Sequence, residues 1–160
     1  METKLLLAYD RPAEIGALFS EYTRMLVTQD PTFAAYLKLQ NYDEELRHLE
    51  GKYGLPDGRL YLALQDGAPA GCIALRKLDA ERCELKRLYV RPAFRGRGLA
   101  RLLTEQIIRD ARAIGYRRIL LDTLPFLENA IHLYRSLGFT DAPRYNDSPL
   151  DTTLFLQLDL

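Results

Sequence analysis

The sequence predicts an α/β protein whose mixed, mostly antiparallel central sheet is flanked by about four helices. Three observations point to this class. Apolar residues alternate along several short segments after residue 58, they recur at helical spacing before and after those segments, and one helical stretch lies between two buried strands. Because 160 residues are enough for a sizeable core, we expect residues 1–160 to form a single domain.

The first third of the chain predicts one strand and two helices. Residues 4–9 are expected to form the strand, after which Asp10 can cap a first helix. The residues expected on the buried face of this helix are Ile15, Leu18, Phe19, Tyr22 and Leu26. Residues 28–40 are expected to be irregular, and a second helix is predicted to start at Asn41 or Asp43.

The rest of the chain predicts a meander followed by a crossover. The meander is antiparallel, and its strands are expected at 59–65, 70–78 and 83–90. From Leu99 the apolar period becomes helical, and residues 117–123 form a buried strand, so the third and fourth of these strands are expected to be parallel. The remaining elements are a helix from Pro125 to Gly138 and strands near 139–145 and 152–160. The predicted order is therefore β-α-α-β-β-β-α-β-α-β-β.

Charge is balanced over the whole chain but not locally. The 22 basic and 22 acidic residues cancel, so no overall field favours nucleic acid or a membrane surface. Residues 82–118 hold eleven Lys/Arg and three Asp/Glu, a net charge of +8, which indicates a local site for an anion. A rival interpretation, a nucleic-acid binder that uses this segment, predicts that DNA affinity falls steeply with salt.

The cysteines and histidines suggest neither a disulfide framework nor a metal site. Cys72 and Cys83 are too few and too irregularly spaced, and His48 and His132 lie far apart. We therefore expect free buried thiols and no metal. The apolar run at residues 5–8 is too short for a signal peptide or a membrane span, which predicts a cytoplasmic protein.

An arginine-rich turn leads into the predicted central helix. Such a turn offers an anion unpaired backbone N–H groups and the positive end of the helix dipole. Gly96 and Gly98 leave room for a diphosphate, while Arg95 and Arg97 can add charge-assisted hydrogen bonds. The segment lacks a P-loop string, and an arginine stands where a dinucleotide-binding GxGxxG needs its last glycine. A third pattern, [RQ]xxGx[GA] between a strand and a helix, is matched by Arg95, Gly98 and Ala100.

Two strings in register, "LYVRPAFRGRGLARLL" (88–103) and "AIHLYRSLGF" (130–139), resemble motifs of the GNAT superfamily of N-acetyltransferases. The resemblance covers nearly all the chain and implies the GNAT (acyl-CoA N-acyltransferase) fold with acetyl-CoA as co-substrate. It also implies that the backbone of Leu88 and Val90 pairs with the pantetheine arm and that the Val90 N–H stabilises an oxyanion. The residues that the resemblance places at the cofactor are Leu88, Tyr89, Val90, Arg95, Gly96, Arg97, Gly98, Leu99, Ala100 and Arg101.

Acetyl transfer to an amine requires a neutral nucleophile, a stabilised oxyanion and a proton for the leaving thiolate. Tyr134 matches the motif tyrosine that serves as the general acid in this superfamily; the alternative is that it only packs on the inner face of its helix. Leu127 stands where the motif often has an asparagine that touches the cofactor, and Asn129 lies on a different helix face, so that role is not transferred.

Glu84 is predicted to be the general base. It is expected to be in phase with Lys86 and Leu88 on one face of its strand. A carboxyl pKa of roughly 4 lies far below an amine pKa of about 10, so Glu84 would act through water or with its pKa raised by burial. The alternative is a surface ion pair with Lys86 or Arg82. Asp122 and Glu128 are further candidates for the base.

Acceptor specificity is expected to come from the first two helices and the closing loops. The tyrosines that could border an amine pocket are Tyr36, Tyr42 and Tyr53, beside an acidic run that equally suits a solvated helix start. The cations that could hold a substrate carboxylate are Arg76, Lys86 and Arg87. Residues 144–149 could form a loop over the cleft, and "DTLP" at 122–125 differs from the sequence usual in ribosomal-protein N-terminal acetyltransferases.

The predicted function is transfer of the acetyl group of acetyl-CoA to a primary amine of a small molecule, by direct attack in a ternary complex. The alternatives are a protein or peptide N-acetyltransferase and a non-catalytic acetyl-CoA-binding sensor module. The expected partners are acetyl-CoA and the small amine, with no nucleic acid and no membrane. The sequence leaves open whether the chain forms a homodimer.

Overall fold

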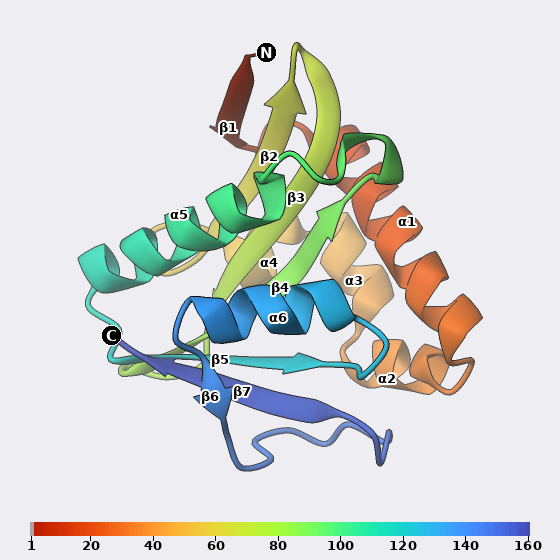
Figure 1. Ribbon diagram of the computed structural model, residues 1–160, viewed down its shortest axis with the longest axis vertical. Helices are drawn as coiled ribbons and strands as arrows, with labels where there is room; N and C mark the ends of the chain where they lie inside the picture. The colour runs from red at the N-terminus through yellow and green to blue at the C-terminus, as the bar shows by residue number, and fades with distance from the viewer. Residues whose placement is uncertain (1) are drawn as a thin grey trace.

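Seven strands form one continuous sheet in the computed structural model, which describes residues 2–160 (Figure 1). The strands are β1 (Thr3–Leu7), β2 (Arg59–Gln65), β3 (Ala68–Lys77), β4 (Arg82–Val90), β5 (Arg118–Thr123), β6 (Thr140–Asp141) and β7 (Leu154–Asp159). Their order across the sheet is β1-β2-β3-β4-β5-β7-β6. Every neighbouring pair is antiparallel except β4 and β5, which are parallel. The predicted mixed sheet and its crossover are therefore confirmed.

Six α-helices cover the sheet. They are α1 (Pro12–Gln29), α2 (Phe33–Leu39), α3 (Tyr42–Arg47), α4 (Leu49–Tyr53), α5 (Leu99–Ile114) and α6 (Glu128–Ser136). The prediction of irregular chain over 28–40 is wrong, because α1 runs on to Gln29 and α2 follows almost at once. Phe33 and Tyr36 stabilise this short helix by packing into a cluster with Leu26 and Leu124, so tertiary burial overrides its weak local signal.

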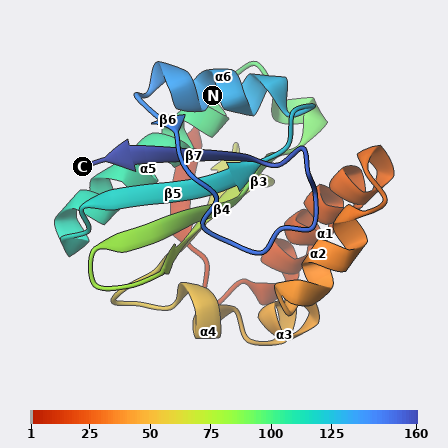
Figure 2. The same cartoon turned by 90° about the horizontal axis from the view of Figure 1, so that it is seen from below.

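The helices lie on both faces of the sheet (Figures 1 and 2). On one face, α1 and α4 pack against the inner strands through a cluster that includes Leu18, Phe19 and Tyr53. On the other face, α5 and α6 pack through a second cluster that includes Leu103, Ile107 and the ring of Tyr134. Helix α6 begins at Glu128, three residues after the predicted start at Pro125, and ends before Gly138, whose φ of 103° is the expected left-handed helix end.

Strand β4 carries a β-bulge that decides which of its side chains reach each face. Its pairing with β3 shifts register between Cys72, opposite Tyr89, and Ala74, opposite Lys86. Arg87 is the extra residue, and its φ of 60° lies in the left-handed region that non-glycine residues seldom adopt. The alternation of side chains is therefore interrupted in the middle of the strand.

Two other sequence expectations can be compared with the fold. Cys72 and Cys83 are free and buried, as predicted, and burial raises the pKa of both thiols. Within residues 2–160, no helix combines the length and the apolar character needed to cross a bilayer.

Candidate active site

A large groove of about 520 Å³ lies between β4, α1, the turn before α5 and the start of α6. Most of the residues predicted to contact the cofactor line it. These are Leu88, Tyr89, Val90, Arg95, Gly96, Gly98, Leu99, Ala100 and Arg101. Arg97 is the predicted residue that does not line the groove; its guanidinium lies 5.7 Å from the centre of the Phe94 ring. Nine of the ten residues predicted to contact the cofactor thus line one cavity.

The turn into α5 presents backbone donors to this groove. Gly96 and Gly98 both have a φ of 78°, a conformation that glycine adopts without strain, and a Cβ at either position would meet no atom within 4 Å. The first helical hydrogen bond runs from the Leu102 N–H to the Gly98 carbonyl at 3.0 Å. The N–H groups of residues 99–101 therefore have no acceptor within the helix, and they face the anion-favouring end of its dipole.

The arginines around the turn have different roles. Arg95 donates from Nε to the Val90 carbonyl at 3.0 Å, and Arg101 donates from Nη2 to Ser136 Oγ at 2.9 Å. Arg91 is held by Glu21 through three hydrogen bonds of 2.7 to 3.1 Å, which lower the pKa of that carboxyl, and it does not line the groove. Arg91 thus anchors α1 to the end of β4.

Strands β4 and β5 separate at the groove. Their parallel pairing extends only from Arg82–Arg118 to Glu84–Leu120, so the later residues of β4 have no strand beside them on that edge. The Arg91 N–H points the other way, toward the Ala70 carbonyl on the β3 side, at 2.8 Å. Because successive residues of a strand direct their N–H groups to opposite edges, those of Leu88 and Val90 face the gap.

A second, polar pocket adjoins the groove. Its volume is about 30 Å³, room for about two water molecules by the same measure. Four residues line both cavities and so mark their junction: Tyr22, Leu88, Leu127 and Tyr134. The other residues of the polar pocket are Leu26, Phe33, Tyr36, Gln40, Leu85, Lys86, Arg87, Asp122, Thr123, Leu124 and Thr153.

Tyr134 of α6 stands at this junction. Its ring is buried and packs against Phe139 with 5.6 Å between ring centres. Burial is the main cause that raises the pKa of its hydroxyl, and Tyr22 and Asp122 raise it further, so the group keeps its proton at neutral pH. Tyr134 therefore combines core packing with a protonated donor at the meeting point of two cavities.

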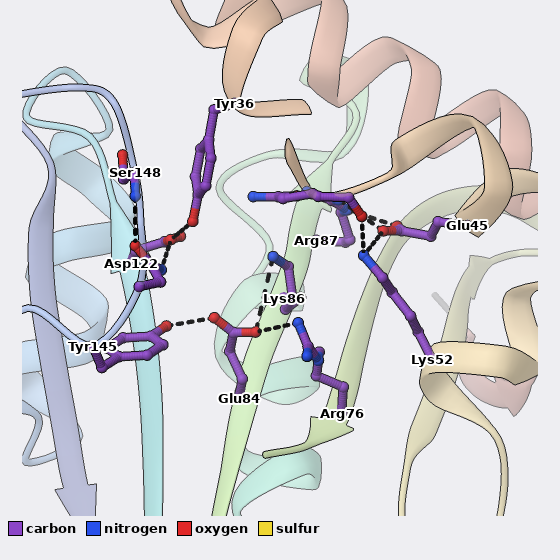
Figure 3. Close-up of polar contacts among 12 residues, drawn as sticks. Tyr36, Glu45, Lys52, Arg76, Glu84, Lys86, Arg87, Asp122, Tyr145 and Ser148 are labelled. Atoms are coloured by element: carbon purple, nitrogen blue, oxygen red, sulfur yellow. Dashed lines mark hydrogen bonds and ion pairs between the residues drawn. The ribbon is translucent and has the colours of Figure 1, made fainter. Parts of the chain in front are cut away.

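Glu84 does not lie where the sequence pattern suggested. The bulge at Arg87 breaks the predicted phase, so Leu88 packs with the α5–α6 cluster and does not share a face with Glu84. The Glu84 carboxylate lines neither cavity; it accepts a hydrogen bond from the Tyr145 hydroxyl at 2.5 Å and pairs with Arg76 at 3.4 Å (Figure 3). Its contacts are those of a buried structural carboxylate.

Asp122, at the end of β5, is the carboxylate that lines the polar pocket. It accepts hydrogen bonds from the Tyr36 hydroxyl and from Asn146 Nδ2, the latter at 2.7 Å (Figure 3). Both partners are neutral, and within residues 2–160 no ion pair reaches it. Of the further candidates for the base, Asp122 thus faces the polar pocket, whereas Glu128 lines the groove.

A buried ion network supports the pocket from the side of α2 and α3. Arg87 donates to both oxygens of Glu45 at 2.9 Å, and Lys52 donates to Glu45 Oε1 at 3.0 Å. Arg87 also donates to Gln40 Oε1 at 2.7 Å. Of the three tyrosines expected to border an amine pocket, Tyr36 lines the polar pocket, Tyr42 stacks on Arg87, and Tyr53 is fully buried in the core beside α1.

Sequence reasoning missed several residues of the site. Asn129, to which no role was transferred, lines the groove beside Leu127. Tyr22 was predicted only as a buried residue of α1, and Gln40 lay in a segment expected to be irregular. The helical period of α1 does mark Tyr22, but no local pattern shows that the C-terminal ends of α2 and β5 meet.

Comparison with known proteins identifies the chain. The sequence model of the Acetyltransferase (GNAT) family matches residues 18–139. A curated, uncharacterized N-acetyltransferase of Schizosaccharomyces pombe is 38% identical over 130 residues, which cover 80% of each chain. The chain belongs to the GNAT family of acetyltransferases. This GNAT enzyme is also 31% identical to human N-acetylaspartate synthetase over 137 residues, which cover 84% of this chain and 43% of that protein.

Solved structures agree with the GNAT fold. An acetyltransferase from Streptococcus agalactiae matches with a TM-score of 0.77 and 23% identity, covering 99% of this chain and 98% of that one. A GNAT family acetyltransferase from Elizabethkingia anophelis, with acetyl-CoA bound, matches with a TM-score of 0.56 and 23% identity over 65% of this chain and 77% of that one. The resemblance seen in the sequence is confirmed, and the GNAT chain is an acetyl-CoA-dependent N-acetyltransferase.

Proposed function

We propose that this GNAT enzyme transfers the acetyl group of acetyl-CoA to a primary amine of a small molecule, by direct attack while both substrates are bound. The observation that carries the proposal is the meeting of two cavities at Tyr134. One is a long groove with helix-start N–H donors, and the other is a small pocket with charged walls. Two cavities that share one wall allow the two substrates to react without a covalent enzyme intermediate.

The groove suits acetyl-CoA along its length. The N–H groups at the start of α5, with Gly96 and Gly98, would hold the pyrophosphate, and Arg101 is a candidate for the 3′-phosphate. The N–H groups of Leu88 and Val90 would pair with the pantetheine arm at the gap between β4 and β5. In this arrangement the thioester would lie near Tyr134, at the entrance of the polar pocket.

Asp122 is the carboxylate that we assign as the base, in place of Glu84, because it lines the pocket that the amine would enter. Asp122 takes a proton from the acceptor ammonium, directly or through a water molecule, and the nitrogen lone pair forms a bond to the acetyl carbonyl carbon. The Val90 N–H would stabilise the resulting oxyanion. The carbon–sulfur bond then breaks as the Tyr134 hydroxyl protonates the leaving sulfur, and the second nitrogen proton restores that hydroxyl through solvent.

Burial matches the acid to its leaving group. A phenol whose pKa is raised is a weaker acid, which alone would slow proton transfer to a thiolate. The same dry environment would raise the pKa of a thiol that leaves into the junction, as burial does for Cys72 and Cys83. The two pKa values therefore move in the same direction, and the transfer stays feasible.

A small acceptor is favoured over a protein by the size and position of the polar pocket. The pocket holds about two water molecules and lies beneath α2 and the segment that carries Asn146. Human N-acetylaspartate synthetase, one of the relatives, is named for a small acetylated product. Both facts support a compact amine whose reacting end enters the pocket.

The test is thiol release from acetyl-CoA across a panel of amino acids, polyamines, aminoglycosides and peptides. For an accepted amine, Tyr134→Phe should lower kcat at least about 100-fold, as expected on losing a general acid, while acetyl-CoA affinity changes less than twofold. Tyr116→Phe is the matched control, because its hydroxyl donates to the Asp57 carbonyl far from both cavities. Wild-type turnover in Tyr134→Phe would limit the residue to packing, and no turnover with any amine would refute the proposed activity.

A further inference from the structure

Three charged side chains line the polar pocket: Arg87, which Glu45 binds, and Lys86 and Asp122, neither of which has an ionic partner at hydrogen-bond distance. The Asp122 carboxylate is bound only by the neutral groups of Tyr36 and Asn146. Lys86 is 6% exposed, and its ammonium forms only a long ion pair with Glu84 Oε1, at 3.9 Å, beyond hydrogen-bond distance. Within residues 2–160, no hydrogen bond from Lys86 Nζ is formed.

The Glu84 carboxylate cannot fully compensate the charge of the Lys86 ammonium, because it has other partners. The same carboxylate pairs with Arg76 at 3.4 Å through Oε1 and accepts the Tyr145 hydroxyl at 2.5 Å through Oε2 (Figure 3). A buried ammonium has three donors, and leaving them without acceptors costs free energy. Burial accordingly lowers the pKa of Lys86, although Glu84 and Asp122 act in the opposite direction. The pocket therefore offers an anion a cation whose hydrogen-bonding capacity is unused.

Of the three cations that the sequence suggested for a substrate carboxylate, only Lys86 is available. Arg87 lines the pocket, but Glu45 binds its guanidinium through both oxygens and Gln40 takes a further donor. Arg76 lines neither cavity and pairs with Glu84. The geometry thus separates one ammonium, which has a single long ion pair and donates no hydrogen bond, from two guanidinium groups that already donate hydrogen bonds.

From this arrangement we infer that the acceptor is an amino acid, whose carboxylate binds Lys86 and whose amine binds Asp122. The inference rests on the proposed function and narrows its acceptor class. Lys86 directly precedes the bulge residue Arg87, and both Lys86 and Asp122 line the polar pocket but not the groove. Because the proposed base must lie beside the reacting nitrogen, the amine end would face the thioester, and the carboxylate end would lie at Lys86.

The experiment compares matched acceptors with wild-type enzyme. Each L-amino acid is assayed beside its amide, its methyl ester and the amine left after removal of the carboxyl group. Because a hydrogen bond between charged groups is worth about 10- to 100-fold, kcat/KM should fall by that factor whenever the carboxylate is missing. Equal rates for an amino acid and its carboxylate-free amine would overturn the inference while leaving the proposed function intact. A peptide acetylated faster than every amino acid would overturn it as well.

A variant pair then tests Lys86 itself. Lys86→Gln should lose about 10- to 100-fold in kcat/KM on the preferred amino acid and lose little on the matched amine, because only the former uses the ammonium. Lys77→Gln is the control, since this exposed lysine of β3 pairs with Asp57 at 3.7 Å and lies outside both cavities. Equal losses on both acceptors would contradict carboxylate binding by Lys86.

Binding measured without turnover separates the two proposals. Calorimetry of the same amino acid and amine pairs, in the presence of coenzyme A, should show the same 10- to 100-fold preference for the amino acid. If the preference appears in binding but no acetylation occurs, the proposed catalysis fails and the pocket assignment stands. If acetylation occurs without any preference in binding, the pocket assignment fails.

Discussion

Replacing Glu45 by glutamine tests the ion network beneath the polar pocket. Glu45 is 2% exposed, and Arg87 and Lys52 lower the pKa of its carboxyl from 4.5 to about 2 against the opposing effect of burial. A difference of about 2.5 pKa units corresponds to about 3 kcal/mol of stability at pH 7, in line with the cost of breaking a buried ion pair. Glu45→Gln should therefore lower the free energy of unfolding by about 3 kcal/mol at that pH.

The pH dependence gives this prediction a definite sign. Because the folded-state pKa is lowered, the stabilisation is complete above pH 4.5 and is lost as the pH falls toward about 2. By pH 3 about 2 kcal/mol of the difference between wild type and Glu45→Gln should have disappeared. Urea denaturation of both proteins at several pH values measures it. Glu44→Gln, on the same helix with an exposed partner in Arg47, should change stability by less than about 0.5 kcal/mol. A loss under 1 kcal/mol at pH 7, or one that does not vary with pH, would refute the reasoning.

Five further substitutions test the groove and the base. Gly98→Glu should abolish acetyl-CoA binding in calorimetry by placing a negative charge at the helix start. Gly98→Ala, which meets no atom within 4 Å but must adopt a φ of 78°, should keep binding and lose about 1 kcal/mol of stability. Glu21→Gln should leave acetyl-CoA affinity unchanged, because it frees Arg91 outside the groove; a large gain in affinity would indicate that the freed Arg91 reaches a phosphate. Asp122→Asn should lower kcat at least about 100-fold and Glu84→Gln less than tenfold, and the reverse order would return the base role to Glu84.

The cofactor side of the site could be predicted because its requirements are local. A turn with a left-handed backbone favours glycine, so Gly96 and Gly98 predict this turn from the sequence alone. The register of Tyr134 within its helix likewise depends only on nearby residues. Both features belong to short, continuous pieces of chain.

The acceptor side could not be predicted because its geometry comes from distant partners. The bulge that puts Glu84 and Leu88 on different faces centres on Arg87. Glycine or asparagine at this position would predict a left-handed backbone, but arginine does not. Arg87 is bound by Glu45, 42 positions earlier in the chain. Asp122 likewise meets Tyr36 from 86 positions away, across α2 and β5. Such contacts depend on how the helices pack on the sheet, and the local spacing of apolar residues cannot predict them.

The gap between β4 and β5 links the stability of the sheet to a substrate in the proposed complex. In the proposed complex, acetyl-CoA supplies hydrogen-bond partners to two strand amides that the protein leaves open at Leu88 and Val90. A donor that binds only the folded chain stabilises it by about 2.7 kcal/mol at a concentration 100 times its dissociation constant. The acetyl-CoA level of the surroundings would then govern the lifetime of the enzyme as well as its rate. A chain deprived of donor would be the first to open, and it would open between the strands where it normally works.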